Sequence, residues 1–302
     1  MITHMESATA KLCSFARAFH SNKGKDRIFD DYLAFDMMGW QDYERTGQLI
    51  QNAYRPELFD PACAFDSQCI LKQINRYLSP IPLFRAALAE DELEQFAEEH
   101  GGCQYVICGA GMDTFAFRNT NPDIEVYELD HPDTQKYKME RIETLEWNIP
   151  ANVHYVPVDF SKDDMAEELV RAGYEKDRPS FFVILGVTYY LTLPMFENTL
   201  ERIGVLTEAG SQLAFDFPDD TTFRPERSER VRTLSQLTAY LGEKMCHGYS
   251  ESELARALSR HGFSILQLLD PEDLQKQFFE GRSDGMEAYE NIHYILAARS
   301  GD

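Results

Sequence analysis

Short apolar runs alternate with amphipathic stretches over most of this chain. From residue 104 onward the runs are rich in Val, Ile, Phe and Tyr, and between them apolar residues recur at helical spacing. Such an alternation predicts a mainly parallel sheet with helices on its faces. The runs place the predicted strands at 104–108, 124–129, 153–158, 180–185, 211–216, 263–268 and 292–297.

The same pattern predicts how the strands are covered and connected. The run at 180–185 is almost wholly apolar, as expected for a central strand that is buried on both faces. Pro132 suits the first turn of a helix, and Ser250 with Glu253 three residues later predicts a capping box at the start of another. The seven runs predict a doubly wound α/β sheet that binds its ligand at the carboxyl ends of the strands.

Two segments fall outside this alternation. Residues 1 to about 100 are mostly helical in pattern, and no Pro/Gly/Ser-rich linker separates them from the first strand. We therefore expect a helical cap packed on the sheet, within a single domain over 1–302 whose α/β core begins at about residue 101. The charged segment 221–249, which follows the fifth strand, is expected to form a lid.

The composition is that of an ordinary folded protein and excludes some partners. Of the 302 residues, 43% are hydrophobic and 12% aromatic, which is enough for a substantial core. The 51 Asp and Glu outnumber the 29 Lys and Arg, and the formal charge of −22 opposes contact with nucleic-acid phosphates or anionic membranes. We expect neither as a partner.

The cysteines and the hydropathy of the chain favour a cytoplasmic location. None of the six Cys forms a C-x-x-C pair, and no clustered ligands predict a metal site. The N-terminus has no basic segment followed by an apolar one. No apolar run approaches the roughly 20 residues that cross a bilayer. We therefore expect a soluble, reduced protein without a bound metal.

A glycine-rich turn follows the first predicted strand. It reads Gly109-Ala-Gly-Met-Asp-Thr114, and its glycines would let the backbone approach a ligand closely. A dinucleotide-binding loop would have a third glycine where Thr114 stands, at the start of the helix that binds the pyrophosphate. The turn therefore indicates a nucleotide-like ligand without a pyrophosphate. A plain tight turn is the alternative.

Acidic residues end the next two predicted strands. Glu128 and Asp130 close the second strand, and Asp159, followed by Phe160, closes the third. Carboxylates accept hydrogen bonds from ribose hydroxyls, and residues two apart on a strand point to the same side. Asp159 and Phe160 suit an adenine amine and ring. These residues, in this order on successive strand ends, favour a nucleoside pocket. The alternative is that the acids are solvated charges at the strand ends.

Longer strings in the chain are more specific than these single features. The run from Gly109 to Arg118 reads Gly-Ala-Gly-Met-Asp-Thr-Phe-Ala-Phe-Arg. It is followed by Tyr-Glu-Leu-Asp-His-Pro at 127–132, Val-Asp-Phe at 158–160, Gly-Val-Thr-Tyr-Tyr-Leu at 186–191 and Phe-Asp-Phe at 215–217. Together these strings resemble the leucine carboxyl methyltransferase family, which includes protein phosphatase carboxyl methyltransferases and bacterial polyketide O-methyltransferases.

The resemblance implies a class I, Rossmann-like methyltransferase that uses S-adenosyl-L-methionine. The implied cofactor residues belong to the glycine turn, the strand ends and the cap: Arg85, Gly109, Ala110, Gly111, Asp113, Glu128, Asp130, Asp159, Phe160 and Leu185. Arg85 would pair with the methionine carboxylate, which its planar guanidinium suits. Asp130, assisted by Glu128, would bind the ribose, and Asp159 with Phe160 the adenine. The family usually has a glutamate where this chain has Leu185, which cannot accept a hydrogen bond.

Methyl transfer from a sulfonium is an in-line displacement, so alignment and exclusion of water are the main requirements. No catalytic residue is assigned. Candidates for a base or for orienting the acceptor are Tyr189, Tyr190 and His247, with Asp216. Core packing for the two tyrosines and an exposed position for His247 are the favoured alternatives.

The sequence thus predicts an O-methyltransferase acting on a hydroxyl or carboxyl group of a small molecule. Methylation of a protein C-terminus is the alternative within the family. A nicotinamide-dependent oxidoreductase is opposed by the missing third glycine, and Leu185 raises the alternative of a non-catalytic binding protein on the same fold. The oligomeric state is not predicted.

Overall fold

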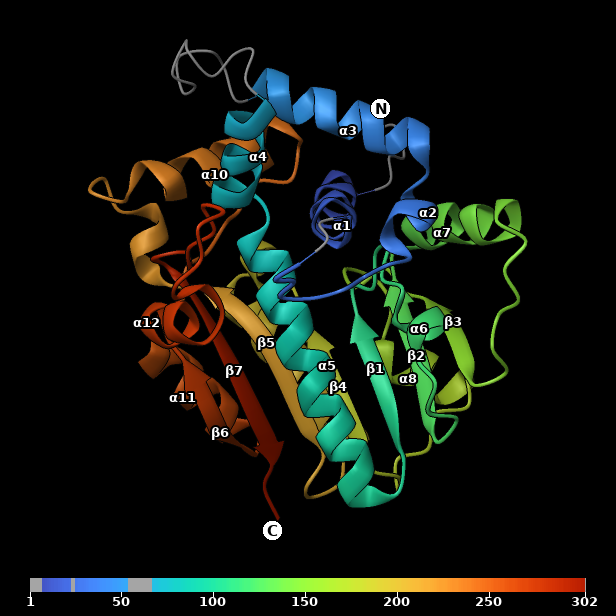
Figure 1. Ribbon diagram of the computed structural model, residues 1–302. Coiled ribbons are helices and arrows are strands. Elements are labelled where there is room, and N and C mark those ends of the chain that lie inside the picture. The colour runs from blue at the N-terminus through green and yellow to red at the C-terminus, as the bar shows by residue number, and fades with distance from the viewer. Residues whose placement is uncertain (1–6, 23–24, 54–66, 302) are drawn as a thin grey trace.

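A seven-stranded mixed sheet forms the centre of the molecule, in the order β3-β2-β1-β4-β5-β7-β6. The computed structural model describes residues 7–22, 25–53 and 67–301 (Figure 1). β1 to β5 are parallel, and β7 is antiparallel to both of its neighbours. The strands are β1 (Cys103–Cys108), β2 (Ile124–Asp130), β3 (Val153–Pro157), β4 (Ser180–Ile184), β5 (Gln212–Pro218), β6 (Phe263–Leu269) and β7 (Ile292–Arg299). The predicted doubly wound α/β class is confirmed.

The strand ends differ from the sequence prediction by two residues or fewer. The largest differences are at β5 and β7, which both run longer at their carboxyl ends. Pro218 at the end of β5 pairs with Ile292, and Arg299 at the end of β7 pairs with Phe263. These antiparallel pairings extend the strands beyond their apolar runs, because backbone hydrogen bonding and not side-chain hydropathy sets the ends.

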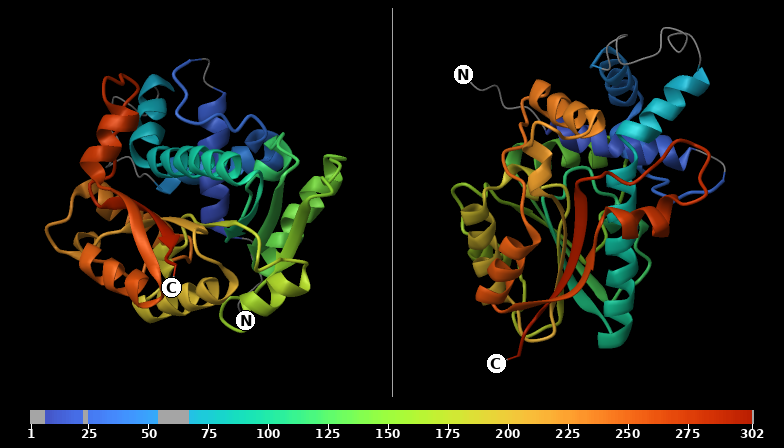
Figure 2. Two further views of the ribbon diagram at one scale, coloured as in Figure 1. Left: turned by 90° about the horizontal axis from the view of Figure 1, so that it is seen from below. Right: turned by 90° about the vertical axis from the view of Figure 1, so that its left-hand side faces the viewer.

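Helices cover both faces of the sheet (Figure 2). In β4, Phe181 and Val183 pack in one hydrophobic cluster with residues of α5, while Phe182 and Ile184 pack in another with residues of α9. This alternation confirms the prediction that 180–185 is a central strand buried on both sides. The helices of the core are α5 (Pro80–His100), α6 (Phe115–Arg118), α7 (Pro132–Thr144), α8 (Met165–Arg171), α9 (Leu193–Leu206), α11 (Glu251–Arg260) and α12 (Pro271–Leu274).

Capping residues mark several helix ends as the sequence predicted. Ser250 and Glu253 form the expected capping box at the start of α11, and Pro132 begins α7. α5 ends where Gly101 adopts a left-handed conformation with φ of 67°, which a residue without Cβ takes easily. Short helical turns complete the chain at Thr188–Tyr190, Asp220–Phe223 and Gln275–Phe279.

A helical cap lies over the carboxyl ends of the parallel strands, at the top of Figure 1. It consists of α1 (Ala8–Ser21), α2 (Ala34–Met38), α3 (Trp40–Ala53) and α4 (Ser67–Tyr77). The last helix of the expected cap over 1–100, α5, instead packs against one face of the sheet. α10 (Glu229–Tyr240), from the segment after β5, joins the cap: Leu237 packs in one cluster with Leu12 and Phe15 of α1. The two segments that the sequence set apart thus pack on each other above the sheet.

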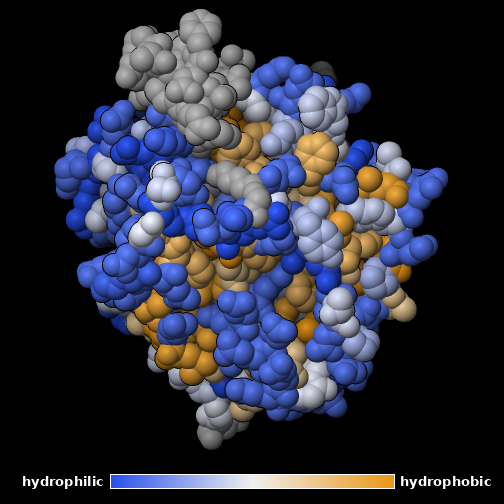
Figure 3. Space-filling view, in the orientation of Figure 1, coloured by the Kyte–Doolittle hydropathy of each residue, from blue (hydrophilic) through white to orange (hydrophobic). Residues whose placement is uncertain are grey.

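The surface is largely polar on the face shown in Figure 3, with apolar side chains visible between the polar ones. The described part of the chain contains no helix long and apolar enough to cross a membrane.

Candidate functional site

A cavity of about 520 Å³ lies between the carboxyl ends of the strands and the cap. Its floor is the turn after β1 together with the ends of β2 and β4, and its roof is α1 and the segment 242–244. Of the expected cofactor residues it is lined by Arg85, Gly109, Ala110, Gly111, Asp113, Asp130, Phe160 and Leu185. Two further expected residues, Glu128 and Asp159, do not line it.

The glycine turn is closely packed on both sides. Gly109 has φ of 81°, and a Cβ there would lie 2.6 Å from Val187 Cγ2. Gly111 has φ of 54°, and a Cβ there would lie 3.1 Å from Cβ of Ala10 on α1. Both conformations are ones that L-residues rarely adopt. The glycines therefore allow the backbone to line the cavity directly beneath α1.

Asp130 ends β2 beside this turn. Its Oδ2 accepts a hydrogen bond from the backbone N–H of Gly111 over 2.5 Å, and its Oδ1 accepts one from the N–H of His131 over 2.7 Å. Burial raises the pKa of Asp130, and the two hydrogen bonds oppose that shift. Each carboxylate oxygen retains capacity for a further hydrogen bond, so Asp130 can still accept from a hydroxyl in the cavity.

Glu128 has a different partner from the one expected. Its carboxylate accepts a hydrogen bond from Lys138 of α7, and both side chains are almost completely buried. Burial raises the pKa of Glu128 to about 7, although Lys138 opposes the shift. The expectation that Glu128 assists Asp130 from within the cavity is therefore corrected: α7 covers this part of β2, and the carboxylate pairs with a lysine of that helix.

Arg85 reaches the cavity from α5, next to the end of β4. Its Nη1 lies 3.2 Å from Asp216 Oδ2, and its Nη2 lies 3.3 Å from Cys13 Sγ. Gly186 has φ of 72°, and a Cβ there would lie 2.4 Å from Arg85 Nη1. A side chain at this position would displace the guanidinium, and glycine also takes the positive φ easily.

Asp216 is completely buried and organises this corner of the site. Its Oδ1 accepts from the N–H of Gly186 over 2.7 Å, and its Oδ2 accepts from the Tyr189 hydroxyl over 2.7 Å as well as from Arg85. The sequence suggested Asp216 as a base or an orienting group. The structure makes Asp216 the partner of Arg85. In the sequence, the feature that marked Asp216 was its place as an acid near the carboxyl end of an apolar strand.

Tyr190 lies beside Arg85 at the cavity wall, and its hydroxyl is 3.2 Å from Thr9 Oγ1. Burial raises the pKa of Tyr189 and of Tyr190 above the usual value for tyrosine, so both stay protonated at neutral pH. His247 packs edge-on against Tyr249, with ring centroids 4.6 Å apart, and lines neither this cavity nor the smaller one described below. Both tyrosine hydroxyls are therefore neutral at neutral pH, and that of Tyr189 donates a hydrogen bond to Asp216.

Of the two residues expected at the adenine, Phe160 lines the cavity and Asp159 does not. Phe160 is 41% exposed. The Asp159 carboxylate instead accepts hydrogen bonds from Lys162 and Ser161, which lower its pKa. Leu185, at the end of β4, lines the cavity as expected, but its side chain offers no acceptor.

The string that ends at Arg118 anchors the turn to the cap. Thr114 Oγ1 donates to Asp31 Oδ1 over 2.5 Å, and Arg118 Nε donates to Thr114 Oγ1 over 2.9 Å. Arg17 of α1 donates to Asp31 Oδ2 and to the Met112 carbonyl, each over 2.8 Å. The sequence alone assigned no role to Arg17 or Asp31.

The predicted lid segment meets the start of α1 above the cavity. The carboxylate of Glu243 accepts hydrogen bonds from the N–H groups of Ala8 and Thr9, over 2.7 and 3.2 Å. A carboxylate at a helix N-terminus satisfies unpaired amides and interacts favourably with the helix dipole. This contact ties 242–244 to α1 across the roof.

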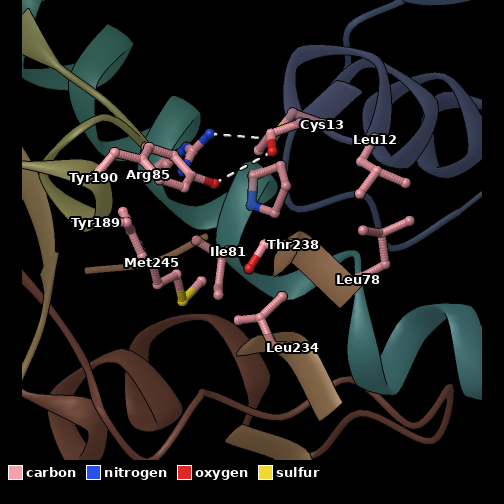
Figure 4. Close-up of a pocket in the computed structure, with 13 residues that line it drawn as sticks. Leu12, Cys13, Leu78, Ile81, Arg85, Tyr189, Tyr190, Leu234, Thr238 and Met245 are labelled. Carbon is pink, nitrogen blue, oxygen red and sulfur yellow. Dashed lines mark hydrogen bonds between the residues drawn. The ribbon is translucent and has the colours of Figure 1, made fainter. Parts of the chain in front are cut away.

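A second, smaller cavity of about 50 Å³ adjoins the first (Figure 4). Both cavities are lined by Thr9, Cys13, Pro82, Arg85, Gly186 and Tyr190. The described residues contain no group of His, Cys, Asp or Glu that could hold a metal ion.

Comparison with known proteins gives consistent results. The family model for leucine carboxyl methyltransferase matches residues 10–204. YktD of Bacillus subtilis (strain 168), whose name describes a candidate S-adenosyl-L-methionine-dependent methyltransferase, is 34% identical over 300 residues, covering 97% of this chain and 98% of that protein.

Two solved structures share the fold. A DUF574 family protein from Streptomyces avermitilis MA-4680 is similar with a TM-score of 0.55 at 13% identity, covering 98% of each chain. A candidate methyltransferase from Thermobifida fusca YX has a TM-score of 0.56 at 14% identity, covering 99% of this chain and 97% of that one. At these identities the likeness concerns the fold alone.

Proposed function

The chain belongs to the leucine carboxyl methyltransferase family and is an S-adenosyl-L-methionine-dependent methyltransferase, and from this premise we propose that it methylates a hydroxyl or carboxyl oxygen of a small molecule. The observation that carries the proposal is the pair of joined cavities, one large and lined by the glycine turn, the other small and apolar. A cofactor and an acceptor can meet at their junction.

The residues of the larger cavity fit the chemistry of the cofactor. We assign the methionine carboxylate to Arg85, a buried guanidinium at the cavity wall. We assign the ribose hydroxyls to Asp130 and the adenine ring to the face of Phe160. Gly109 to Asp113 supply backbone groups between them. When bound, the cofactor supplies an electrophilic methyl group.

The contribution of the protein is then to align the acceptor and to exclude water. α1 and Glu243 close the roof, which shields the reacting atoms. Tyr190 and Thr9 offer hydroxyl groups at the junction that can orient an acceptor oxygen. A carboxyl acceptor is already ionised at neutral pH and needs no base. The membership of this protein in a carboxyl methyltransferase family also supports an oxygen acceptor.

Transfer of a labelled methyl group tests the proposal. The purified protein is incubated with methyl-tritiated S-adenosyl-L-methionine and a panel of small carboxylic acids, phenols and alcohols, together with peptides that end in a free carboxylate. We expect label in a small acid or phenol, with alkali lability separating esters from ethers. Label only in the peptides would favour methylation of a protein C-terminus, and label on nitrogen or sulfur would exclude an O-methyltransferase.

A further inference from the structure

The smaller cavity differs in character from the larger one. The side chains that line only this cavity come from α1, from the start of α5 and the residues before it, from the turn after β4, and from α10 and the loop after it. Most are apolar: Leu12, Leu78, Ile81, Leu234, Thr238 and Met245, with Tyr189. Figure 4 shows them converging from separate segments of the chain on one space. Apolar cavities of this kind stay dry and bind apolar groups.

The charged side chain of the cavity, Arg85, lies at one end, and the hydroxyl of Thr238, which lines only the smaller cavity, donates to the backbone carbonyl of Ser235. Arg85, Tyr190 and Thr9 lie where the smaller cavity meets the larger one, and the Thr9 and Tyr190 hydroxyls are 3.2 Å apart. Among the described residues, no His, Asp, Glu or Lys lines the smaller cavity. A ligand there would direct its polar end towards the junction and its apolar end inward.

The size of the cavity limits the ligand. A volume of about 50 Å³ corresponds to about three to five water-sized groups, at about 10–15 Å³ each. That is room for a short, unbranched aliphatic arm or one edge of a ring. A longer acyl chain would extend beyond this space.

We propose that the smaller cavity is the acceptor pocket, and that it takes a short apolar arm of the substrate while the oxygen to be methylated lies at the junction beside Tyr190. The inference rests on the proposed function, because it takes the larger cavity to hold the cofactor. The substrate class is therefore a small amphiphile with an oxygen head group and an arm of about four carbons.

Chain-length dependence of binding tests the pocket. Straight-chain carboxylates from acetate to octanoate, and the matching 1-alkanols, are titrated into protein saturated with S-adenosylhomocysteine, and binding is followed by ligand-observed NMR. We expect affinity to rise about fourfold per methylene, from about 0.8 kcal/mol per buried CH₂, and to stop rising at about five carbons. A rise in either series supports the proposal.

A variant that fills the cavity supplies the specific control. Leu234 on α10 lines only the smaller cavity, so Leu234→Trp should weaken pentanoate or pentanol binding at least tenfold while leaving adenosylhomocysteine affinity unchanged. Gln236→Phe, on an exposed site of the same helix, should change neither.

Two results would contradict the proposal that the smaller cavity is the acceptor pocket. One is probe binding that is absent or independent of chain length, and the other is binding that is unchanged in Leu234→Trp. If Leu234→Trp unfolds, Leu234→Phe with a measured melting temperature takes its place. Loss of adenosylhomocysteine binding in the unsubstituted protein would instead contradict the proposed function, so the two failures are distinguishable.

Discussion

The Arg85 guanidinium on α5 donates a hydrogen bond to the Asp216 carboxylate near the end of β5, over 3.2 Å. Burial alone would lower the pKa of Arg85, but Asp216 raises it above its usual value, so the guanidinium stays charged. Asp216 also bonds Gly186 and Tyr189. One buried carboxylate thus sets the position of the cation that faces the cofactor cavity.

Substituting Arg85 should weaken cofactor binding. Arg85→Lys keeps a positive charge for Asp216 but loses the planar fork, so adenosylhomocysteine affinity in calorimetry should fall about tenfold or more. Arg85→Ala should lose more and also unfold more easily, because Asp216 is left buried without its cation. Arg232→Ala, at an exposed site on α10, is the control. Wild-type affinity in Arg85→Lys and Arg85→Ala would mean that the carboxylate site lies elsewhere.

Asp130→Ala should lower adenosylhomocysteine affinity by about tenfold or more, because charge-assisted hydrogen bonds to the ribose would be lost. Asp123→Ala, just before the opposite end of the same strand, removes the same group from an exposed site and should bind normally. Calorimetry on both proteins compares the two strand ends. Equal adenosylhomocysteine affinities of Asp130→Ala and Asp123→Ala would mean that Asp130 does not bind the ribose.

Gly186→Ala should reduce both stability and cofactor affinity. A positive φ costs alanine about 1–2 kcal/mol, and the new Cβ would also lie 2.4 Å from Arg85 Nη1. Gly210→Ala is a matched control, since Gly210 has φ of 90° but no atom within 4 Å of a Cβ. Urea unfolding should show a cost in both variants, whereas adenosylhomocysteine affinity should fall only in Gly186→Ala. A loss of affinity in both would point to a general effect of stability.

Leu185→Glu restores the family's residue at the end of β4. We expect it to tighten cofactor binding about tenfold, the value of one charge-assisted hydrogen bond to the methionine amino group. Leu185→Met is the control for a change of shape without a new acceptor. Unchanged or weaker binding in Leu185→Glu would mean that another group in the cavity already accepts from that amino group.

The pH dependence of the free energy of unfolding should reflect the titration of Glu92 on α5. Burial raises its pKa to about 7, and the Tyr294 hydroxyl, which donates to Glu92 Oε2, opposes the shift. Because the folded state holds the proton more tightly than the unfolded chain, stability is highest below the unfolded pKa of about 4.3 and falls as pH rises to about 7.

Glu92→Gln should reduce that decline by up to about 2 kcal/mol in urea unfolding between pH 5 and 8. Glu94→Gln, at an exposed position on the same helix, should leave the decline as it is. A decline in Glu92→Gln equal to that of the unsubstituted protein would assign it to other buried carboxylates.

Periodic features were predicted well because they depend on local sequence. Apolar runs located all seven strands, and Ser250 with Glu253 located the start of α11. Glu128 and Asp130 show what local sequence did not predict. Both are acids at the end of one strand, yet Glu128 pairs with Lys138 and Asp130 faces the cavity, because α7 covers one and the glycine turn meets the other.

By itself the sequence determined the α/β class, the glycine turn and the family, since these depend on residue periodicity and on strings of neighbouring residues. Only the tertiary structure decided the partners of the buried charges. Asp216 is 131 residues from Arg85, and Asp31 is 83 from Thr114. The tertiary structure also formed the apolar cavity, from residues of α1, α5, α10 and the turn after β4. Contacts between distant segments depend on how helices pack above the sheet, which no local pattern records.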